Sequence, residues 1–144
     1  MNLESPLTTV AHTIQLSVAP VFLLTALGTF LGVLSTRLGR IVDRARVLGA
    51  RVGATASEQD TVQAELHLLS RRRHLVNMAI TCGVTAALLV CAIISSLFLG
   101  SILRANVSWL TAVLFVAAML AFTAALLLFL REILMAVASV RIDG

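Results

Sequence analysis

Arginine is the residue type with the clearest chemistry in this 144-residue sequence, which contains no lysine. Eight of the eleven basic residues fall between positions 37 and 74: Arg37, Arg40, Arg44, Arg46, Arg51, Arg71, Arg72 and Arg73. A guanidinium group carries five N–H donors in a planar fork that fits carboxylate and phosphate oxygens. The pattern therefore favours anion binding over covalent or acid–base chemistry.

Acidic residues match only part of this arginine cluster. If the chain folds back near residue 55, Arg44 comes level with Glu65, and Arg51 comes level with Glu58. We predict both as salt bridges that set the register of a helical hairpin. No carboxylate is expected at the level of the arginines nearest the base of the hairpin. For these arginines we predict binding to anions outside the chain, the headgroups of anionic lipids. These lipid-binding or anion-binding residues are Arg37, Arg40, Arg71, Arg72 and Arg73. The alternative is that they only enforce topology through the positive-inside rule.

Catalytic and metal-binding residues are not expected. The three longest apolar segments contain no Asp, Glu, Lys, Arg or His, which argues against a pump, a coupled transporter, a voltage sensor and intramembrane catalysis. Cys82 and Cys91 do not have zinc-site spacing. Arg71-Arg72-Arg73 adjoins an apolar segment and lacks nearby aromatic residues, so nucleic acid is not an expected partner. We therefore predict a protein that is not an enzyme and that uses no metal or cofactor.

The elements that position the arginines are membrane helices. Hydrophobic residues make up 59% of the chain and charged residues 12%, with a mean hydropathy of +1.00, whereas soluble domains average about 25% charged residues. Three uncharged windows reach the roughly 20 residues that a spanning helix needs. We predict an all-α integral membrane protein, a single membrane domain over 1–144, with spans at about 16–36, 76–99 and 109–130.

A helical hairpin and a final helix are expected outside the spans. On the first arm of the hairpin, apolar residues recur at spacings of three and four, at Leu38, Ile41, Ala45 and Leu48. A matching apolar set on the second arm consists of Val62, Leu66 and Leu69. This periodicity predicts a hairpin at about 37–75, and a C-terminal helix is expected at about 131–142. The segments outside the spans hold 0, 8, 1 and 2 arginines in chain order. The positive-inside rule then predicts a multi-pass inner-membrane protein with its N-terminus outside and both the hairpin and the C-terminus in the cytoplasm.

Small residues form a seam along the first span. The seam residues are Thr25, Gly28, Gly32, Ser35 and Gly39, which share one helical face. Membrane helices associate where small residues let their backbones approach closely. Two interpretations stay open: the seam packs against this chain's own second or third span, or it forms a contact between copies in a homo-oligomer.

Several short segments resemble a known family. They are Ile14-Gln15-Leu16, Ala19-Pro20-Val21-Phe22-Leu23-Leu24, Arg37-Leu38-Gly39-Arg40-Ile41-Val42-Asp43-Arg44, Arg72-Arg73 and Leu75-Val76-Asn77-Met78-Ala79-Ile80. In this order they resemble a bacterial family of small membrane proteins, domain of unknown function 2721, over roughly residues 8–135. The resemblance implies a three-span inner-membrane protein and no particular activity.

Two functional hypotheses follow. The first is a self-associating helical module whose basic hairpin contacts anionic lipid or a cytoplasmic protein partner. The second is a small homo-oligomeric ion channel with arginines at its cytoplasmic mouth. Three spans cannot enclose a pore alone, so the channel requires an oligomer, whereas the module only permits one.

Overall fold

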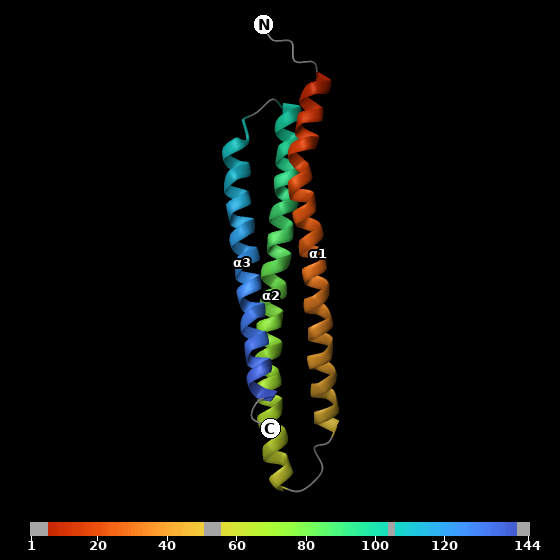
Figure 1. The fold of residues 1–144 in the computed structure, drawn as a ribbon, viewed down its shortest axis with the longest axis vertical. Coiled ribbons are helices and arrows are strands. Elements are labelled where there is room, and N and C mark those ends of the chain that lie inside the picture. The colour runs from red at the N-terminus through yellow and green to blue at the C-terminus, as the bar shows by residue number, and fades with distance from the viewer. Residues whose placement is uncertain (1–5, 51–55, 104–105, 141–144) are drawn as a thin grey trace. The chain divides into compact units, whose positions relative to one another are not determined.

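Three long α-helices make up the described chain. The computed structural model describes residues 6–50, 56–103 and 106–140, and it describes their side chains except at 6, 7, 9, 56–59 and 138–140. Helix α1 spans Pro6–Ala50, α2 spans Ala56–Leu103 and α3 spans Ser108–Val140 (Figure 1). Each helix is long and apolar enough to cross a membrane. The expected all-α class with three candidate spans is confirmed, and it indicates a multi-pass membrane protein.

Each helix continues without interruption past its predicted span. Helix α1 includes the span at 16–36 and the arginine-rich segment after it, and α2 includes 60–75 before the span at 76–99. Helix α3 includes the span at 109–130 and continues through Arg131 and Glu132. The apolar periodicity extends beyond the uncharged windows, and such an amphipathic stretch remains stable as a helix where one face is covered.

Burial follows a seven-residue repeat along the helices. On α1 the buried positions include Leu27, Leu34, Ile41 and Leu48, and on α3 they include Ala118, Ala125 and Glu132. A seven-residue repeat is typical of helices that pack with a shallow left-handed supercoil. Each helix therefore presents a narrow face to its neighbours. Large apolar side chains on the other faces stay exposed, as lipid-facing side chains would.

The chain divides into two compact units, each built from one stretch of every helix. Unit 1 comprises Met1–Phe30 and Gly83–Thr123, and unit 2 comprises Leu31–Cys82 and Ala124–Gly144. The core of unit 1 is formed by Leu27, Ala86, Val90, Ile93 and Ala118. Phe30 and Phe122 meet edge to face at 5.7 Å between ring centroids. Among its described residues, unit 1 contains no Asp, Glu, Lys or Arg.

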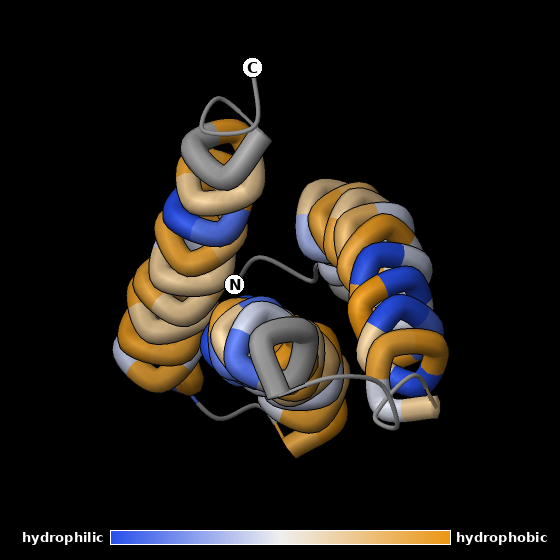
Figure 2. The backbone as a smooth tube through the Cα atoms, turned by 90° about the horizontal axis from the view of Figure 1, so that it is seen from below, coloured by the Kyte–Doolittle hydropathy of each residue, from blue (hydrophilic) through white to orange (hydrophobic). Residues whose placement is uncertain are grey.

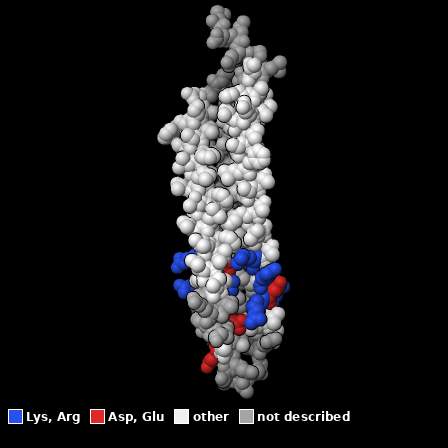
Figure 3. All heavy atoms as spheres, viewed as in Figure 1, with Lys and Arg blue, Asp and Glu red and all other residues white. Residues whose placement is uncertain are grey.

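Unit 2 carries every charged side chain that the structure describes. Its buried apolar positions are Leu34, Ile41, Leu48, Leu69, Val76, Ala79 and Ala125. Around this core the arginines and carboxylates gather on α1, α2 and α3, as the blue and red atoms of Figure 3 show. In Figure 2 blue bands, which mark hydrophilic residues, interrupt the largely orange tubes of the helices. Unit 2 therefore contains the charged side chains that could form a binding site.

Candidate anion site

A fully buried carboxylate lies at the centre of unit 2. Glu132 of α3 has 0% relative exposure. Its Oε2 accepts a hydrogen bond from Arg37 Nη1 of α1 at 3.2 Å, and its Oε1 accepts from Arg72 Nη2 and Nε of α2 at 2.8 and 3.3 Å. One carboxylate therefore joins all three helices of the unit. We call Arg37, Arg72 and Glu132 the Glu132 cluster.

Local sequence explains why these groups meet. Glu132 follows Ala118 and Ala125 at seven-residue spacing on the buried face of α3, and Arg72 precedes buried Val76 by one turn on α2. Burial of a charge at such a position raises the free energy of the folded state unless the charge is paired and hydrogen-bonded. The Arg37 guanidinium also lies 5.1 Å from the centre of the Phe129 ring, a cation–π contact that holds it against α3.

The Glu132 cluster corrects one expectation. The sequence indicated no carboxylate for the arginines nearest the spans, and this is wrong for Arg37 and Arg72. Glu132 lies 95 residues from Arg37 along the chain and outside the hairpin, so the pairing of residues across the hairpin does not reveal it. A usable signal was present: Glu132 is the only acidic residue between Glu65 and Asp143, and it falls in the repeat of small buried residues on α3.

The second ion pair of unit 2 follows the predicted register. Arg44 Nη2 lies 2.9 Å from Glu65 Oε1, and Arg44 Nε also donates to this oxygen at 3.2 Å. Both side chains are largely accessible to solvent, so the pair contributes at most about 1 kcal/mol to stability. The other predicted pair, Arg51 with Glu58, lies outside the described side chains.

A cleft opens beside the Glu132 cluster. It has a volume of about 510 Å³ and is lined by Val33, Thr36, Arg37, Arg40, Ile41, Arg44, Leu69, Arg72 and Glu132. Arg40 is exposed, and no carboxylate in the described part of the chain pairs with it. We call this the arginine cleft. Its four guanidinium groups, from Arg37, Arg40, Arg44 and Arg72, are suited to binding an anion.

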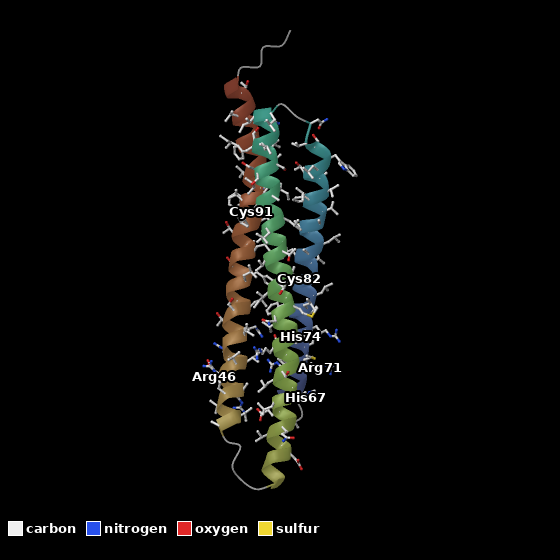
Figure 4. All side chains as sticks on the ribbon, turned by 180° about the vertical axis from the view of Figure 1, so that it is seen from behind. Arg46, His67, Arg71, His74, Cys82 and Cys91 are labelled. Carbon is white, nitrogen blue, oxygen red and sulfur yellow. The ribbon has the colours of Figure 1, made fainter. Side chains whose placement is uncertain are left out.

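Two further predicted anion-binding residues lie outside the arginine cleft. Arg71 and Arg73 of α2 are exposed, and neither makes a salt bridge with a described carboxylate. Figure 4 shows Arg71 and His74 on α2 and Arg46 on α1. The predicted set thus separates into Arg37 and Arg72 with an internal carboxylate, Arg40 in the cleft, and Arg71 and Arg73 on the open surface.

The small-residue seam of α1 faces away from α2 and α3. All five seam residues, Thr25, Gly28, Gly32, Ser35 and Gly39, are exposed. A Cβ atom added at Gly28, Gly32 or Gly39 would meet no described atom within 4 Å, apart from its own stretch of helix. The interpretation that the seam packs against this chain's own spans is therefore wrong. A contact between copies stays a prediction.

A family model for a protein of unknown function, DUF2721, matches residues 17–142. The chain belongs to this family. The DUF2721 match includes the Glu132 cluster, the arginine cleft and the small-residue seam. No curated protein and no solved structure matches the chain. Among the described residues of this DUF2721 protein, no group of three or more His, Cys, Asp or Glu side chains could hold a metal ion.

Proposed function

We propose that this DUF2721 protein is a non-enzymatic, multi-pass membrane module whose arginines bind anionic lipid headgroups. One observation supports this most strongly: Arg40, Arg71 and Arg73 are exposed, pair with no described carboxylate and lie next to long uncharged windows of the sequence. Each arginine near an anionic bilayer surface gains about 1 kcal/mol. Carboxylates of the chain already pair with Arg37, Arg44 and Arg72, whereas Arg40, Arg71 and Arg73 can bind an anion outside the chain.

The depth of these arginines suits headgroup phosphates. Arg40 follows the end of the apolar window at Thr36 by about 6 Å, taking 1.5 Å per helical residue. Arg73 precedes Leu75, where the second apolar window begins, by about 3 Å. These offsets correspond to the interfacial layer that flanks the hydrocarbon core. A soluble protein that docks on the hairpin would contact the same residues and is the alternative partner.

The distribution of arginines supports one orientation. With eight arginines between positions 37 and 74 and none before the first span, the positive-inside rule places the hairpin in the cytoplasm and the N-terminus outside. The C-terminus then also lies in the cytoplasm. We propose the inner membrane of a bacterium as the compartment, which is what the resemblance described in the sequence analysis implies.

Self-association through α1 is the second part of the proposal. The seam around Gly28 and Gly32 is exposed, and no described atom from the rest of the chain lies within 4 Å of a Cβ atom built at either glycine. A second copy that brings its own small residues to this face would allow close backbone contact. An arginine-mouthed ion channel stays the alternative function, and it needs this oligomer to exist.

Lipid selectivity tests the lipid-binding part directly. The protein is placed in nanodiscs that contain equal amounts of anionic phosphatidylglycerol and zwitterionic phosphatidylcholine, and the lipids that remain associated are counted by native mass spectrometry. We expect enrichment of phosphatidylglycerol in the wild type. Arg71→Gln/Arg73→Gln should weaken the preference by about fivefold per arginine, the equivalent of about 1 kcal/mol each.

Arg46→Gln is the matched control for this measurement. Arg46 is exposed on α1 and makes no described salt bridge. It follows Thr36 by about 15 Å, beyond the screening length of about 8 Å at physiological salt. Its loss should leave lipid preference unchanged. A double variant at Arg71 and Arg73 that behaves like Arg46→Gln would contradict lipid binding by these residues.

A further inference from the structure

We propose that the arginine cleft of unit 2 binds one phosphate group of an anionic phospholipid, with Arg40 as its principal ligand. This inference rests on the proposed function, because it requires unit 2 to lie at the headgroup layer. It goes further by predicting a single, defined lipid site that is distinct from the general attraction exerted by Arg71 and Arg73.

The charge of the cleft is the first support. Four guanidinium groups line it, from Arg37, Arg40, Arg44 and Arg72, whereas Glu132 is the only carboxylate in the lining. Glu65 adds a second carboxylate through its pair with Arg44. Four guanidinium groups and two carboxylates leave a net charge of +2 here, and Arg40 is the lining arginine that pairs with no described carboxylate. A phosphate diester of a lipid carries one negative charge and free acceptor oxygens, which makes it a suitable counterion.

Unused hydrogen-bond donors are the second support. Arg40 makes no described hydrogen bond, and Arg37 donates only through Nη1 to Glu132. Each guanidinium has five N–H donors, so most of those on Arg37 and Arg40 stay available. Charge-assisted bonds from arginine to phosphate are commonly bidentate. Arg40 can therefore hold two phosphate oxygens while Arg37 contributes from the cluster.

Glu132 acts as a positioning residue for this site. Both of its oxygens accept hydrogen bonds, Oε1 from Arg72 and Oε2 from Arg37. The side chain has 1% relative exposure, whereas Arg37 and Arg72 retain 39% and 26%. The carboxylate is thus shielded from a ligand that its two arginines can still reach. Arginines held in place this way lose less conformational entropy when a ligand binds.

The apolar part of the lining favours a lipid over free phosphate. Val33, Ile41 and Leu69 share the cleft with the arginines. Val33 lies one helical turn before Arg37, on the side of the predicted span, and is 46% exposed. The volume of about 510 Å³ falls within the range of roughly 300–1,000 Å³ that is typical of ligand pockets. A phosphate at Arg40 would leave space along Val33 and Thr36 for the glycerol and the start of an acyl chain.

Retention of a single lipid tests the site. The full-length protein is released from phosphatidylglycerol nanodiscs by increasing collision energy, and the last lipid adduct is followed by native mass spectrometry. We expect one phosphatidylglycerol per chain in the wild type and in the control variant Arg46→Gln. Arg40→Gln should reduce its occupancy at least tenfold, because bidentate charge-assisted bonds are lost. Equal retention in Arg40→Gln and the wild type would overturn the proposal.

Two comparisons separate this inference from the proposed function and from free phosphate. Arg71→Gln/Arg73→Gln should keep the last adduct while it weakens the overall lipid preference; loss of that adduct in the double variant would overturn the assignment to the cleft. Inorganic phosphate at millimolar concentration, added to the detergent-solubilised protein, should not displace the retained lipid. Arg40-dependent binding of inorganic phosphate without any retained lipid would overturn the lipid assignment.

Discussion

Glu132 is the residue that connects the three helices of unit 2. A fully buried carboxylate is stable there because two guanidinium groups donate to it from different helices. The desolvation cost of such a charge is large, so the cluster contributes little net stability, whereas removal of one partner is expensive. Arg37 and Arg72 reach solvent in part, which moderates the cost of leaving them unpaired.

Substitution of Glu132 should destabilise the protein more than any other single charge change. We expect Glu132→Gln to lower the free energy of unfolding by about 3 kcal/mol, the low end for a broken buried pair. Arg37→Met/Arg72→Met/Glu132→Leu should cost less than the single change, because no buried charge is left unpaired. Unfolding of the protein in detergent measures both.

Glu65→Gln provides the comparison for this residue. It removes the solvent-accessible pair with Arg44 and should cost less than about 1 kcal/mol. If Glu132→Gln proves as mild as Glu65→Gln, the Glu132 cluster does not exist as described.

At the scale of the helices, sequence patterns predicted the elements well and their mutual orientation only in part. Long uncharged windows and the three-four apolar repeat identify each helix, and the same repeat sets the register that brings Arg44 to Glu65. The contact between Arg37 and Glu132 depends on how α3 is rotated about its own axis. Hydrophobicity constrains this rotation weakly where most faces of a helix are apolar. The sequence also left open whether the Gly28–Gly32 face packs against the other helices of the chain or points away from them, because small residues are suited to both positions.

Bulky residues on the α1 seam should prevent self-association without unfolding the chain. A Cβ atom added at position 28 or 32 would meet no described atom within 4 Å, so we expect the single chain to tolerate leucines there, but they would block close approach of a second copy. We expect the wild type to be oligomeric in nanodiscs and Gly28→Leu/Gly32→Leu to be monomeric, with unchanged thermal stability of the monomer. Native mass spectrometry reports the mass of each.

Ala19→Leu/Ala26→Leu is the matched control on α1. Both alanines are exposed and lie off the seam, so the oligomer should persist in this variant. A wild type that is already monomeric would contradict self-association and remove the channel alternative as well. An oligomer that survives the glycine substitutions would show that copies meet through another face.

At the scale of the whole molecule, charge is distributed unevenly between the two units. Every described Asp, Glu and Arg side chain belongs to unit 2, and the described part of unit 1 has none. Hydrocarbon excludes charged side chains, so the exposed apolar surface of unit 1, which includes Leu88 at 65% exposure, is suited to lipid. The arginines of unit 2 require an aqueous or headgroup environment. This division underlies both the proposed orientation and the proposed contact with anionic lipid.

Thiol labelling from each side of the membrane tests this central claim most directly. Single cysteines are introduced as Arg46→Cys, Leu88→Cys or Ile102→Cys into a Cys82→Ala/Cys91→Ala background, and a membrane-impermeant maleimide is applied to inside-out and right-side-out vesicles. We predict that position 46 is labelled only in inside-out vesicles, position 102 only in right-side-out vesicles, and position 88 in neither. Labelling of position 88, or labelling of positions 46 and 102 from the same side, would contradict a membrane-spanning unit 1 with a cytoplasmic arginine segment.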